Sequence, residues 1–404
     1  MATVKERVAA RRAAKARPHI PQRVEELTPE WFSETLGPNH GGAKVVSVET
    51  SEIGAGIGFV GELQRCRLVW DSPADHLPAS VVVKVPTANP TNRALGEGLG
   101  GYQREIDVYS RLADQLGLPM PAFHHGVCDP DPAPWIGTAS LWLFEKLPIG
   151  GVQWLTDRFL ALAEKSKRRY LLIIEDIADA RPPSQVAGGT LDDAAVALEV
   201  LARFHARNWM TGVANQVDNI WPIDRAPKVF QASYRRNRDL FVERFGSLVG
   251  DDMIARMDDV QERLPEMTSS LTRAPYTLLH GDYRLDNILF RPDGQIVVLD
   301  YQLMGVGRPG SDVAYFITTA LTPDHRGAEA ELLRRYHETL VAAGVGDYSH
   351  DDLVADVTVT KELLAHRMIG TGEVLDTALA DGDDSFMDVM VKRVVGWVET
   401  APAG

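Results

Sequence analysis

The feature that most constrains this chain is the stretch HGDYRLDNILF, residues 280–290. It packs a histidine, two aspartates, an arginine and an asparagine into eight residues and then turns apolar. A second acidic phrase, VVLDYQ, contains Asp300 and is separated from the first by a Pro-Asp-Gly turn. Short strands are predicted over residues 276–280, 287–290 and 296–300. The polar residues of the first phrase therefore lie on a loop between strands, where reactive side chains are commonly held.

These two phrases have the chemistry of a phosphoryl-transfer site. Asp282, on the loop, is able to accept a proton from a hydroxyl group. Asn287 offers a neutral oxygen and Asp300 an anionic oxygen to one hard cation, and Mg²⁺ prefers one or two carboxylates completed by phosphate oxygens. Such a base and two such ligands on a strand–loop–strand frame are what phosphoryl transfer to a hydroxyl requires. The alternative interpretation is a polar turn followed by a capped hairpin.

A lysine within a valine-rich segment provides a possible phosphate ligand. Lys84 lies in VVVKVP, within a strand predicted over residues 79–86, and burying its charge is costly unless the charge is paired. A glutamate from the next helix commonly provides that pair beside a nucleotide phosphate. Glu105, in a helix predicted over residues 102–112, is the best partner; Glu97, placed in a loop over 87–101, and Asp107 are alternatives. Lys84 could instead extend to water from an edge strand.

The remaining pattern divides the chain into a β-rich part and a helical part. Further strands are predicted over residues 45–53, 59–70, 122–127, 139–146 and 170–176, and a helix over 155–163 within a segment, residues 149–169, that resembles an insertion. After a linker near residues 175–180 come helices over residues 191–210, 228–245 and 252–268. From Ser311 onward the pattern is helical, with breaks at Pro323, at residues 344–346 and around residues 381–384. The fold class is therefore α+β with two lobes.

The two polar phrases resemble the Brenner motif and the metal-binding motif of the aminoglycoside phosphotransferase and choline kinase-like superfamily. The subfamily that the chain resembles is that of the CHK-type, ecdysteroid kinase-like bacterial phosphotransferases, and the resemblance runs from about Gly54 to Phe316. It implies a protein-kinase-like fold with a β-rich N-terminal lobe and a mainly helical C-terminal lobe. The expected parts are a basic N-terminal arm over residues 1–24, a nucleotide-binding lobe over 25–178 and a catalytic and acceptor-binding lobe over 179–404.

The resemblance also implies a role for each motif residue. Asp282 is expected to be the catalytic base, Asn287 and Asp300 to hold Mg²⁺, and His280 to brace the loop. Lys84 is expected to hold the α- and β-phosphates of ATP. Arg284 would face the transferring phosphate, because a fixed cation stabilises charge on its oxygens, or would form a salt bridge with Asp286.

Two weaker signals complete the expected ATP site. The glycines of GAGIGFVGE, Gly54, Gly56 and Gly58, would let backbone N–H groups approach the phosphates, although such a hairpin alone is usually only a turn. The backbone around Glu175 and Ile177 would pair with the adenine edge. Tyr301 and Gln302 replace the Phe-Gly that follows this aspartate in protein kinases, which puts a protein-kinase-style switch of this segment in doubt.

Two polar residues outside the motif have structural interpretations. His205 is expected to be a core histidine rather than a proton carrier. Asp312 lies at a predicted helix N-cap, and either capping or bracing of the catalytic loop would explain it.

Composition excludes some classes of function. The net charge of −14 argues against general nucleic-acid binding. No run of eighteen apolar residues is present, so no membrane-spanning helix is predicted. The two cysteines show no metal-ligand spacing, and a reducing cytoplasm is the simplest compartment. The sequence predicts no oligomeric state.

The expected function is ATP- and Mg²⁺-dependent phosphorylation of a hydroxyl group on a small molecule. Residues 301–404 carry seventeen Asp/Glu against eight Lys/Arg, which suits a polycationic aminoglycoside. The tryptophans at positions 142, 154, 209 and 221 suit a larger apolar alcohol instead, and a non-antibiotic acceptor is favoured. A catalytically silent nucleotide-binding pseudokinase is the alternative from another class. A protein kinase is less favoured, because no APE-like segment follows Asp300.

Overall fold

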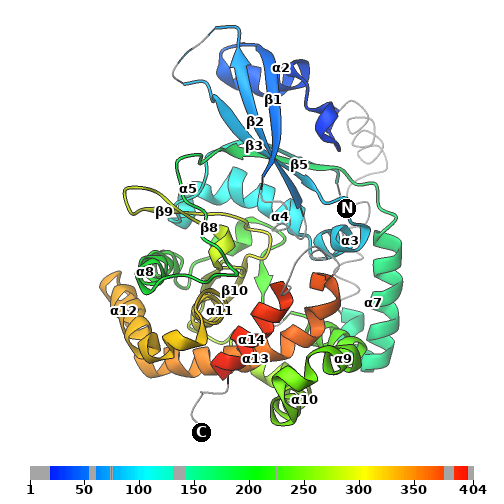
Figure 1. Ribbon diagram of the computed structural model, residues 1–404, viewed down its shortest axis with the longest axis vertical. Coiled ribbons are helices and arrows are strands. Elements are labelled where there is room, and N and C mark those ends of the chain that lie inside the picture. The colour runs from blue at the N-terminus through cyan, green and yellow to red at the C-terminus, as the bar shows by residue number, and fades with distance from the viewer. Residues whose placement is uncertain are drawn as a thin grey trace.

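The computed structural model describes residues 19–53, 61–72, 74, 76–130, 142–223, 225–376 and 386–398 (Figure 1). Most of the basic arm and the three glycines of the predicted nucleotide loop, Gly54, Gly56 and Gly58, lie outside these residues. No helix in the described ranges combines the length and the apolar character that crossing a membrane requires.

The first part of the chain builds an antiparallel five-stranded sheet in the order β1-β2-β3-β5-β4. Its strands are β1 (Val45–Ile53), β2 (Gly61–Trp70), β3 (Ser80–Pro86), β4 (Phe123–Cys128) and β5 (Tyr170–Glu175). The strands predicted near these ranges are confirmed. β3 and β5 are apolar on both faces because both faces are covered: Val81 and Val83 pack into one core cluster, and Val82 packs into another.

Short helices cover the two faces of this sheet. The 3₁₀ turns η1 (Val24–Glu26) and η2 (Gly37–His40) flank α2 (Pro29–Leu36), whose Trp31 and Phe32 share a cluster with Val81 and Val83. The other face is covered by α4 (Gly101–Asp107), the π-helical turn η3 (Val108–Leu112) and α5 (Ala113–Leu116). α4 and η3 confirm the helix predicted over residues 102–112.

Two sequence predictions in this part are wrong. The loop expected over residues 87–101 contains α3 (Pro90–Gly98), because Asn89 caps it by accepting hydrogen bonds from the backbone N–H groups of Thr91 and Asn92. The strand expected over residues 139–146 is helical at residues 142–146. Trp142 and Leu143 there are exposed, so their apolar pattern does not mark a buried strand.

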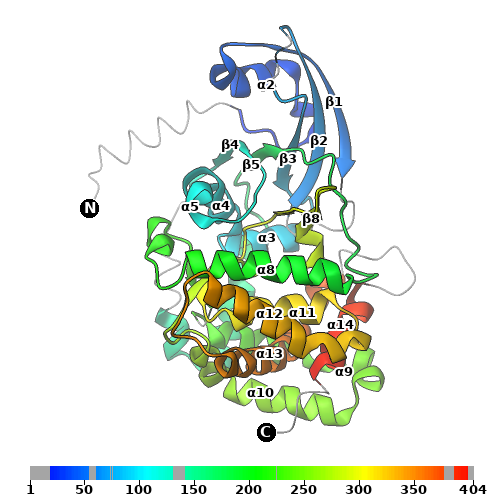
Figure 2. The same cartoon turned by 90° about the vertical axis from the view of Figure 1, so that its left-hand side faces the viewer.

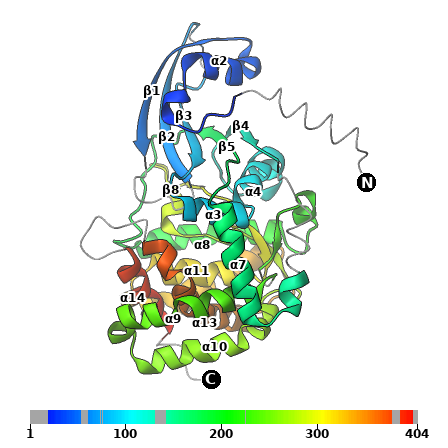
Figure 3. The same cartoon turned by 90° about the vertical axis from the view of Figure 1, so that its right-hand side faces the viewer.

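The predicted helix over residues 155–163 is present as α7 and begins earlier, at Ile149 (Ile149–Ala163). α7 packs against α9 (Pro227–Val249) in the helical part (Figure 3). Asp157 of α7 pairs with Arg236 of α9. The segment therefore contributes to the helical side of the molecule, although its sequence position lies between two strands of the sheet.

The second part of the chain is mainly helical, and Figure 2 shows its long helices stacked below the sheet. These helices are α8 (Leu191–Arg207), α9, α10 (Asp251–Ser270), α11 (Gly310–Ala320), α12 (Glu329–Ala342), α13 (His350–Asp376) and α14 (Phe386–Val398), with the 3₁₀ turns η4 (Val213–Gln216), η5 (Leu285–Asn287) and η6 (Pro323–Ala328). The helices predicted over residues 191–210, 228–245 and 252–268 are confirmed, and so is the helical pattern after Ser311 where the structure describes the chain; the predicted break around residues 381–384 lies outside the described residues.

Small sheets accompany the long helices in this part of the chain. β8 (Ile288–Phe290) pairs with β9 (Ile296–Val298), and β6 (Trp221–Pro222), β10 (Gly305–Gly307) and β7 (Thr277–Leu279) form a three-stranded sheet. A single core cluster joins Leu172 of β5 to Leu201 of α8, Tyr283 and Phe316. The fold is α+β, as predicted, with an antiparallel sheet region followed by a helical region; the boundary near residue 178 stays a prediction.

Candidate active site

The loop between β7 and β8 carries the polar residues of the first motif. His280 is fully buried: its Nε2 lies 3.0 Å from the carbonyl oxygen of Leu299, and its Nδ1 lies 3.3 Å from the backbone N of Asp282. The backbone N–H of Leu299 also donates to the carbonyl oxygen of Asn287 at 2.8 Å. The hydrogen bonds that Leu299 forms with His280 and Asn287 thereby join the loop to the segment that ends in Asp300.

The glycine in this loop is required by the local geometry. Gly281 has a φ of +80°, and a Cβ atom added to it would lie 2.1 Å from the carbonyl oxygen of Leu303. Any side chain would therefore collide with backbone and adopt a strained conformation.

Asp312 fixes the start of the loop from α11. Its Oδ2 accepts from the backbone N–H of His280 at 2.6 Å, and its Oδ1 accepts from that of Gly281 at 3.0 Å. The N-cap position of α11 is Pro309, without a side-chain cap. The N-cap interpretation is therefore wrong, and the bracing interpretation describes the geometry. His205 is fully buried, and its Nε2 lies 3.2 Å from Asp312, so it stands behind the loop rather than on it.

The carboxylate of Asp282 is held by three side chains. Tyr315 donates from its hydroxyl to Oδ1 at 2.8 Å, and Asn287 donates from Nδ2 to Oδ2 at 2.9 Å. The Nε of Arg284 lies 3.3 Å from Oδ1. Asp282 is only partly buried, which leaves it accessible to a reacting group.

Arg284 lies between two carboxylates. Its Nη1 is 2.6 Å from Oδ2 of Asp286, so the predicted salt bridge is present, and its Nε also touches Asp282. Burial opposes the charge on Arg284, but the negative charges of Asp282 and Asp286 outweigh burial and raise its pKa further above its ordinary value. The guanidinium is therefore a fixed cation beside the carboxylate of Asp282.

Lys84 reaches the same region from the five-stranded sheet. Its Nζ lies 2.8 Å from Oε1 of Glu105 and 3.4 Å from Oδ2 of Asp300. β3 is an inner strand, between β2 and β5, so the alternative of an edge strand does not hold. Burial lowers the pKa of Lys84, but the charges of Asp300 and Glu105 outweigh it and leave that pKa raised. Of the other two acids considered, Glu97 pairs with Arg93 and Asp107 with Arg111.

Glu105 has two further partners that sequence reasoning missed. Tyr170 of β5 donates to its Oε2 at 2.8 Å, and the side-chain amide of Gln302 donates to the same oxygen at 3.1 Å. Arg104 donates to the carbonyl oxygen of Gln302 as well. No local pattern marks these residues, because Tyr170 and Gln302 lie 65 and 197 positions from Glu105.

Asp300 has an uncommon backbone conformation. Its φ is +63°, in the left-handed region that residues other than glycine rarely adopt. Burial opposes ionisation of its carboxyl, but the charge of Lys84 outweighs burial and lowers its pKa. Strained residues of this kind cluster at functional sites.

The donor atoms present fit a magnesium ion that is shared with phosphates. Asn287 uses Nδ2 for both of its bonds to Asp282, and its Oδ1 is the atom that a cation would take. Asp300 supplies one carboxylate. Among the described residues no group of three or more His, Cys, Asp or Glu side chains is arranged to hold a metal. Two protein ligands completed by phosphate oxygens match the preference of Mg²⁺.

The segment after β5 is tied to the sheet by its acidic side chains. Glu175 accepts from the backbone N–H of Ala122 at 3.0 Å, and Asp176 pairs with Arg65 at 2.8 Å and accepts from Ser80. Ile177 is buried. These side chains fix the course of the chain where it leaves the sheet for the helical part.

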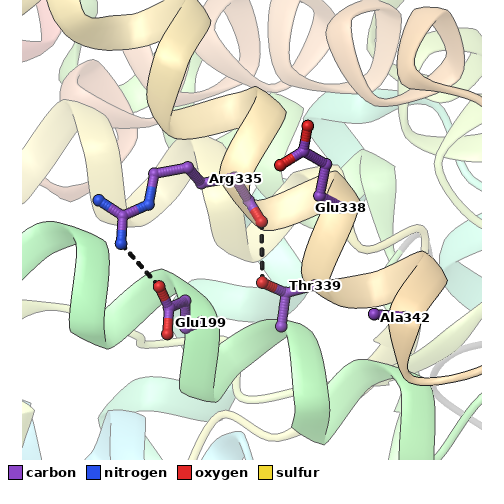
Figure 4. Close-up of a pocket in the computed structure, with 5 residues that line it drawn as sticks. All are labelled: Glu199, Arg335, Glu338, Thr339 and Ala342. Carbon is purple, nitrogen blue, oxygen red and sulfur yellow. Dashed lines mark hydrogen bonds and ion pairs between the residues drawn. The ribbon is translucent and has the colours of Figure 1, made fainter.

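A hollow on the surface elsewhere lies between α8 and α12 (Figure 4). Arg335 spans it to pair with Glu199 at 2.7 Å, and Glu338, Thr339 and Ala342 complete its lining. None of the motif residues lines it, and it carries no functional assignment.

The chain is similar to known proteins in part of its sequence and in its fold. The model of the ecdysteroid kinase-like family matches residues 157–344, which include the loop, Asp300 and Asp312. Acyl-CoA dehydrogenase family member 11 of Pongo abelii is 54% identical over 41 residues, which are 10% of this chain and 5% of that protein. Member 10 of Mus musculus is 51% identical over 41 residues, 10% of this chain and 4% of that protein. The chain therefore spans about a twentieth of the length of these relatives.

Among solved structures, spectinomycin phosphotransferase APH(9)-Ia, in complex with ADP and spectinomycin, has a TM-score of 0.51 to this chain. The alignment covers 94% of this chain and 98% of that one, at 10% identity. At this identity the likeness shows a common fold.

Proposed function

Taking the chain as a member of the aminoglycoside phosphotransferase and choline kinase-like superfamily, which the family match and the common fold support, we propose that it is an ATP- and Mg²⁺-dependent small-molecule kinase. It would transfer a phosphoryl group to a hydroxyl of its acceptor.

One observation carries this proposal: the contact between Lys84 and Asp300. Lys84 comes from the middle of the five-stranded sheet and Asp300 from the end of a strand in the second part of the chain, yet their charged atoms lie 3.4 Å apart. Burying the charges of Lys84 and Glu105 beside the partly buried carboxylate of Asp300 is costly unless each charge is paired. A site for phosphates and their cation provides a functional reason for that cost.

In this proposal each charged group has one task. Lys84 binds the α- and β-phosphates of ATP, and Glu105 keeps its ammonium group in place. Asn287 and Asp300 hold Mg²⁺, which neutralises phosphate charge when it is bound. Asp282 accepts the proton of the acceptor hydroxyl, and Arg284 supplies a fixed positive charge beside it.

The rest of the ATP site rests on the resemblance alone. The backbone around Glu175 and Ile177 would receive adenine. Gly54, Gly56 and Gly58 would lie over the phosphates.

The acceptor that we favour is a non-antibiotic alcohol. Some acids of the C-terminal region are paired with basic side chains, for example Asp356 with Arg308 and Glu329 with Lys361, and this pairing reduces the field that they offer to a polycation. The relatives named as acyl-CoA dehydrogenases add hydroxyacyl-CoA to the compounds to be tested first. The aminoglycoside alternative rests on a likeness of fold only.

The tryptophans considered for an apolar acceptor fall into two groups. Trp209 donates to Asp347, and the ring of Trp221 contacts the guanidinium groups of Arg104 and Arg225, so both tryptophans have structural roles. Trp142 and Trp154 are 64% and 63% exposed and remain available for contacts with an apolar molecule.

The test replaces the proposed base. Asp282→Ala is expected to bind Mg-ATP with an affinity within threefold of the wild type and to lose at least about 100-fold in turnover, because general-base catalysis contributes roughly that much. Turnover is measured as ADP release with panels of hydroxyacyl-CoAs, sterols, amino alcohols and aminoglycosides. Asp293→Ala, in the exposed turn between β8 and β9, is the matched control.

Two outcomes would overturn parts of the proposal. Wild-type turnover in Asp282→Ala would refute Asp282 as the base. Saturable Mg-ATP binding by the wild type without ADP release, with any acceptor or with water, would favour the pseudokinase instead.

A further inference from the structure

A tyrosine that no motif contains touches the proposed base. The hydroxyl of Tyr315 donates to Oδ1 of Asp282 at 2.8 Å, across 33 positions of sequence. Tyr315 lies on α11, one turn after Asp312. The carboxylate of Asp312 accepts hydrogen bonds from the backbone N–H groups of His280 and Gly281. Residues three apart lie on one side of a helix, so one side of α11 contacts both the backbone and the reactive side chain of the loop.

The hydrogen bonds to Asp282 restrict rotation of its carboxylate. Asn287 binds Oδ2 and Tyr315 binds Oδ1, so turning the carboxylate plane breaks at least one bond. Arg284 lies nearly equidistant from the two oxygens, at 3.3 and 3.4 Å, and does not select between their positions. Tyr315 is therefore the side chain that defines where Oδ1 lies.

The phenol can act only as a donor in this contact. Burial, together with the negative charge of Asp282, raises the pKa of Tyr315 well above its ordinary value, so the hydroxyl keeps its proton. The other charged groups that act on Tyr315 are Arg284 of the loop and Arg367 of α13. Both are cationic and lower the pKa of Tyr315, but that pKa stays well above its ordinary value, so the hydroxyl still donates its hydrogen bond.

We propose that Tyr315 is a positioning residue for phosphoryl transfer: it holds the Asp282 carboxylate in the orientation that receives the acceptor's proton. This inference rests on the proposed function and adds to it a residue outside the motifs. Positioning of this kind matters because a displacement of about 1 Å at a reacting group is able to cost roughly 100-fold in rate.

The experiment removes one oxygen atom. Tyr315→Phe is expected to lower kcat for Mg-ATP hydrolysis, with water as the acceptor, about tenfold, because hydrogen bonds to charged groups are the stronger ones. The KM for ATP should stay within twofold, since Lys84, Asn287 and Asp300 are untouched. Tyr234→Phe is the matched control: its hydroxyl donates to Asp258 at the same 2.8 Å, in the packing of α9 against α10.

A double-mutant cycle separates positioning from a general structural role. In an Asp282→Asn background, Tyr315→Phe should change kcat by less than twofold, because the two substitutions act through the same carboxylate. An unchanged kcat in the single variant would overturn the inference, and so would a tenfold loss that persists in the Asp282→Asn background. A wild-type rate in Asp282→Asn alone would instead refute the part of the proposed function that makes Asp282 the base.

A crystal structure of Tyr315→Phe with Mg²⁺ and AMP-PNP tests the same point without turnover. The Asp282 carboxylate is expected to rotate or to occupy two orientations. A single, unchanged orientation would overturn the inference.

Discussion

At the residue scale, the candidate site is a set of buried and partly buried charges that stabilise one another. Lys84, Glu105 and Asp300 form one group, and Arg284 lies between Asp282 and Asp286 in the other. A buried charge that loses its partner is strongly destabilising, whereas the complete pair contributes little net stability. The arrangement is therefore better explained by what these groups bind than by the stability that they add.

Tyr170→Phe tests whether the Tyr170 hydroxyl stabilises the group formed by Lys84, Glu105 and Asp300. It removes a donor to Oε2 of Glu105 and leaves Gln302, so the free energy of unfolding should fall by about 1.5 kcal/mol and the KM for ATP should rise. Urea unfolding and steady-state kinetics measure the two effects. Tyr109→Phe is the control, because the buried Tyr109 hydroxyl has no hydrogen-bond partner among the described residues. Equal stability losses in both variants would contradict the assigned role of the Tyr170 hydroxyl.

At the element scale, single helices connect distant parts of the chain. α11 braces the loop between β7 and β8 through Asp312 and Tyr315. α13 packs along α9, and the ring of His366 on α13 stacks on the ring of Tyr234 on α9 with centroids 4.4 Å apart. The Nε2 atom of His366 lies 2.8 Å from the amide oxygen of Gln261 on α10. His366 is therefore a titratable side chain buried where α13 packs against α9 and α10.

His366 makes the packing of α13 sensitive to acid. Burial lowers its pKa to about 3, whereas the unfolded chain binds a proton near the ordinary value of 6.5. Between these values the unfolded state holds the extra proton, so stability is complete above pH 6.5 and falls as the pH decreases. The contribution of His366 is a loss of about 2 kcal/mol between pH 6.5 and 5.

His366→Gln should therefore flatten the plot of Tm against pH in that range. The exposed control His76→Gln should keep the wild-type slope. Burial lowers the pKa of His205 too, so part of the slope should persist in His366→Gln. An unchanged slope in His366→Gln would show that His366 does not set the acid sensitivity.

At the scale of the whole molecule, the site lies where the sheet meets the helical region. One core cluster runs through that junction, from Tyr102 and Leu172 to Phe204 and Phe316. Lys84 and the loop between β7 and β8 therefore share a packed support although they belong to different parts of the sequence. A ligand that bridges the two should stabilise the chain as a unit.

Mg-ATP should accordingly raise the Tm. At a concentration of 100 times Kd the stabilisation is about 2.7 kcal/mol, which for a chain of this length corresponds to a rise of roughly 3–5 °C. Adding EDTA should remove more than half of the rise, because Asn287 and Asp300 would lose the cation that they share with the phosphates. Differential scanning fluorimetry measures both effects.

Lys84→Met should reduce the rise caused by Mg-ATP, and the exposed control Lys44→Met should retain it. A full rise in Lys84→Met would refute Lys84 as a phosphate ligand.

The sequence by itself determined the element types and the residues of the polar loop. Alternation and valine-rich runs identify β1 to β3 and β5, and the motif spacing places Asp282 and Asn287 on a loop beside the strand that leads to Asp300, because these features depend on neighbours within a few residues. Local patterns also mislead: they predict a loop where α3 lies, and part of a strand over residues 142–146, which are helical. Only the tertiary structure brought Tyr170 and Gln302 to Glu105, and Tyr315 to Asp282. Those contacts depend on how one element packs on another, and a tyrosine or glutamine has the same local signature whether it packs in a core or orients a charged group.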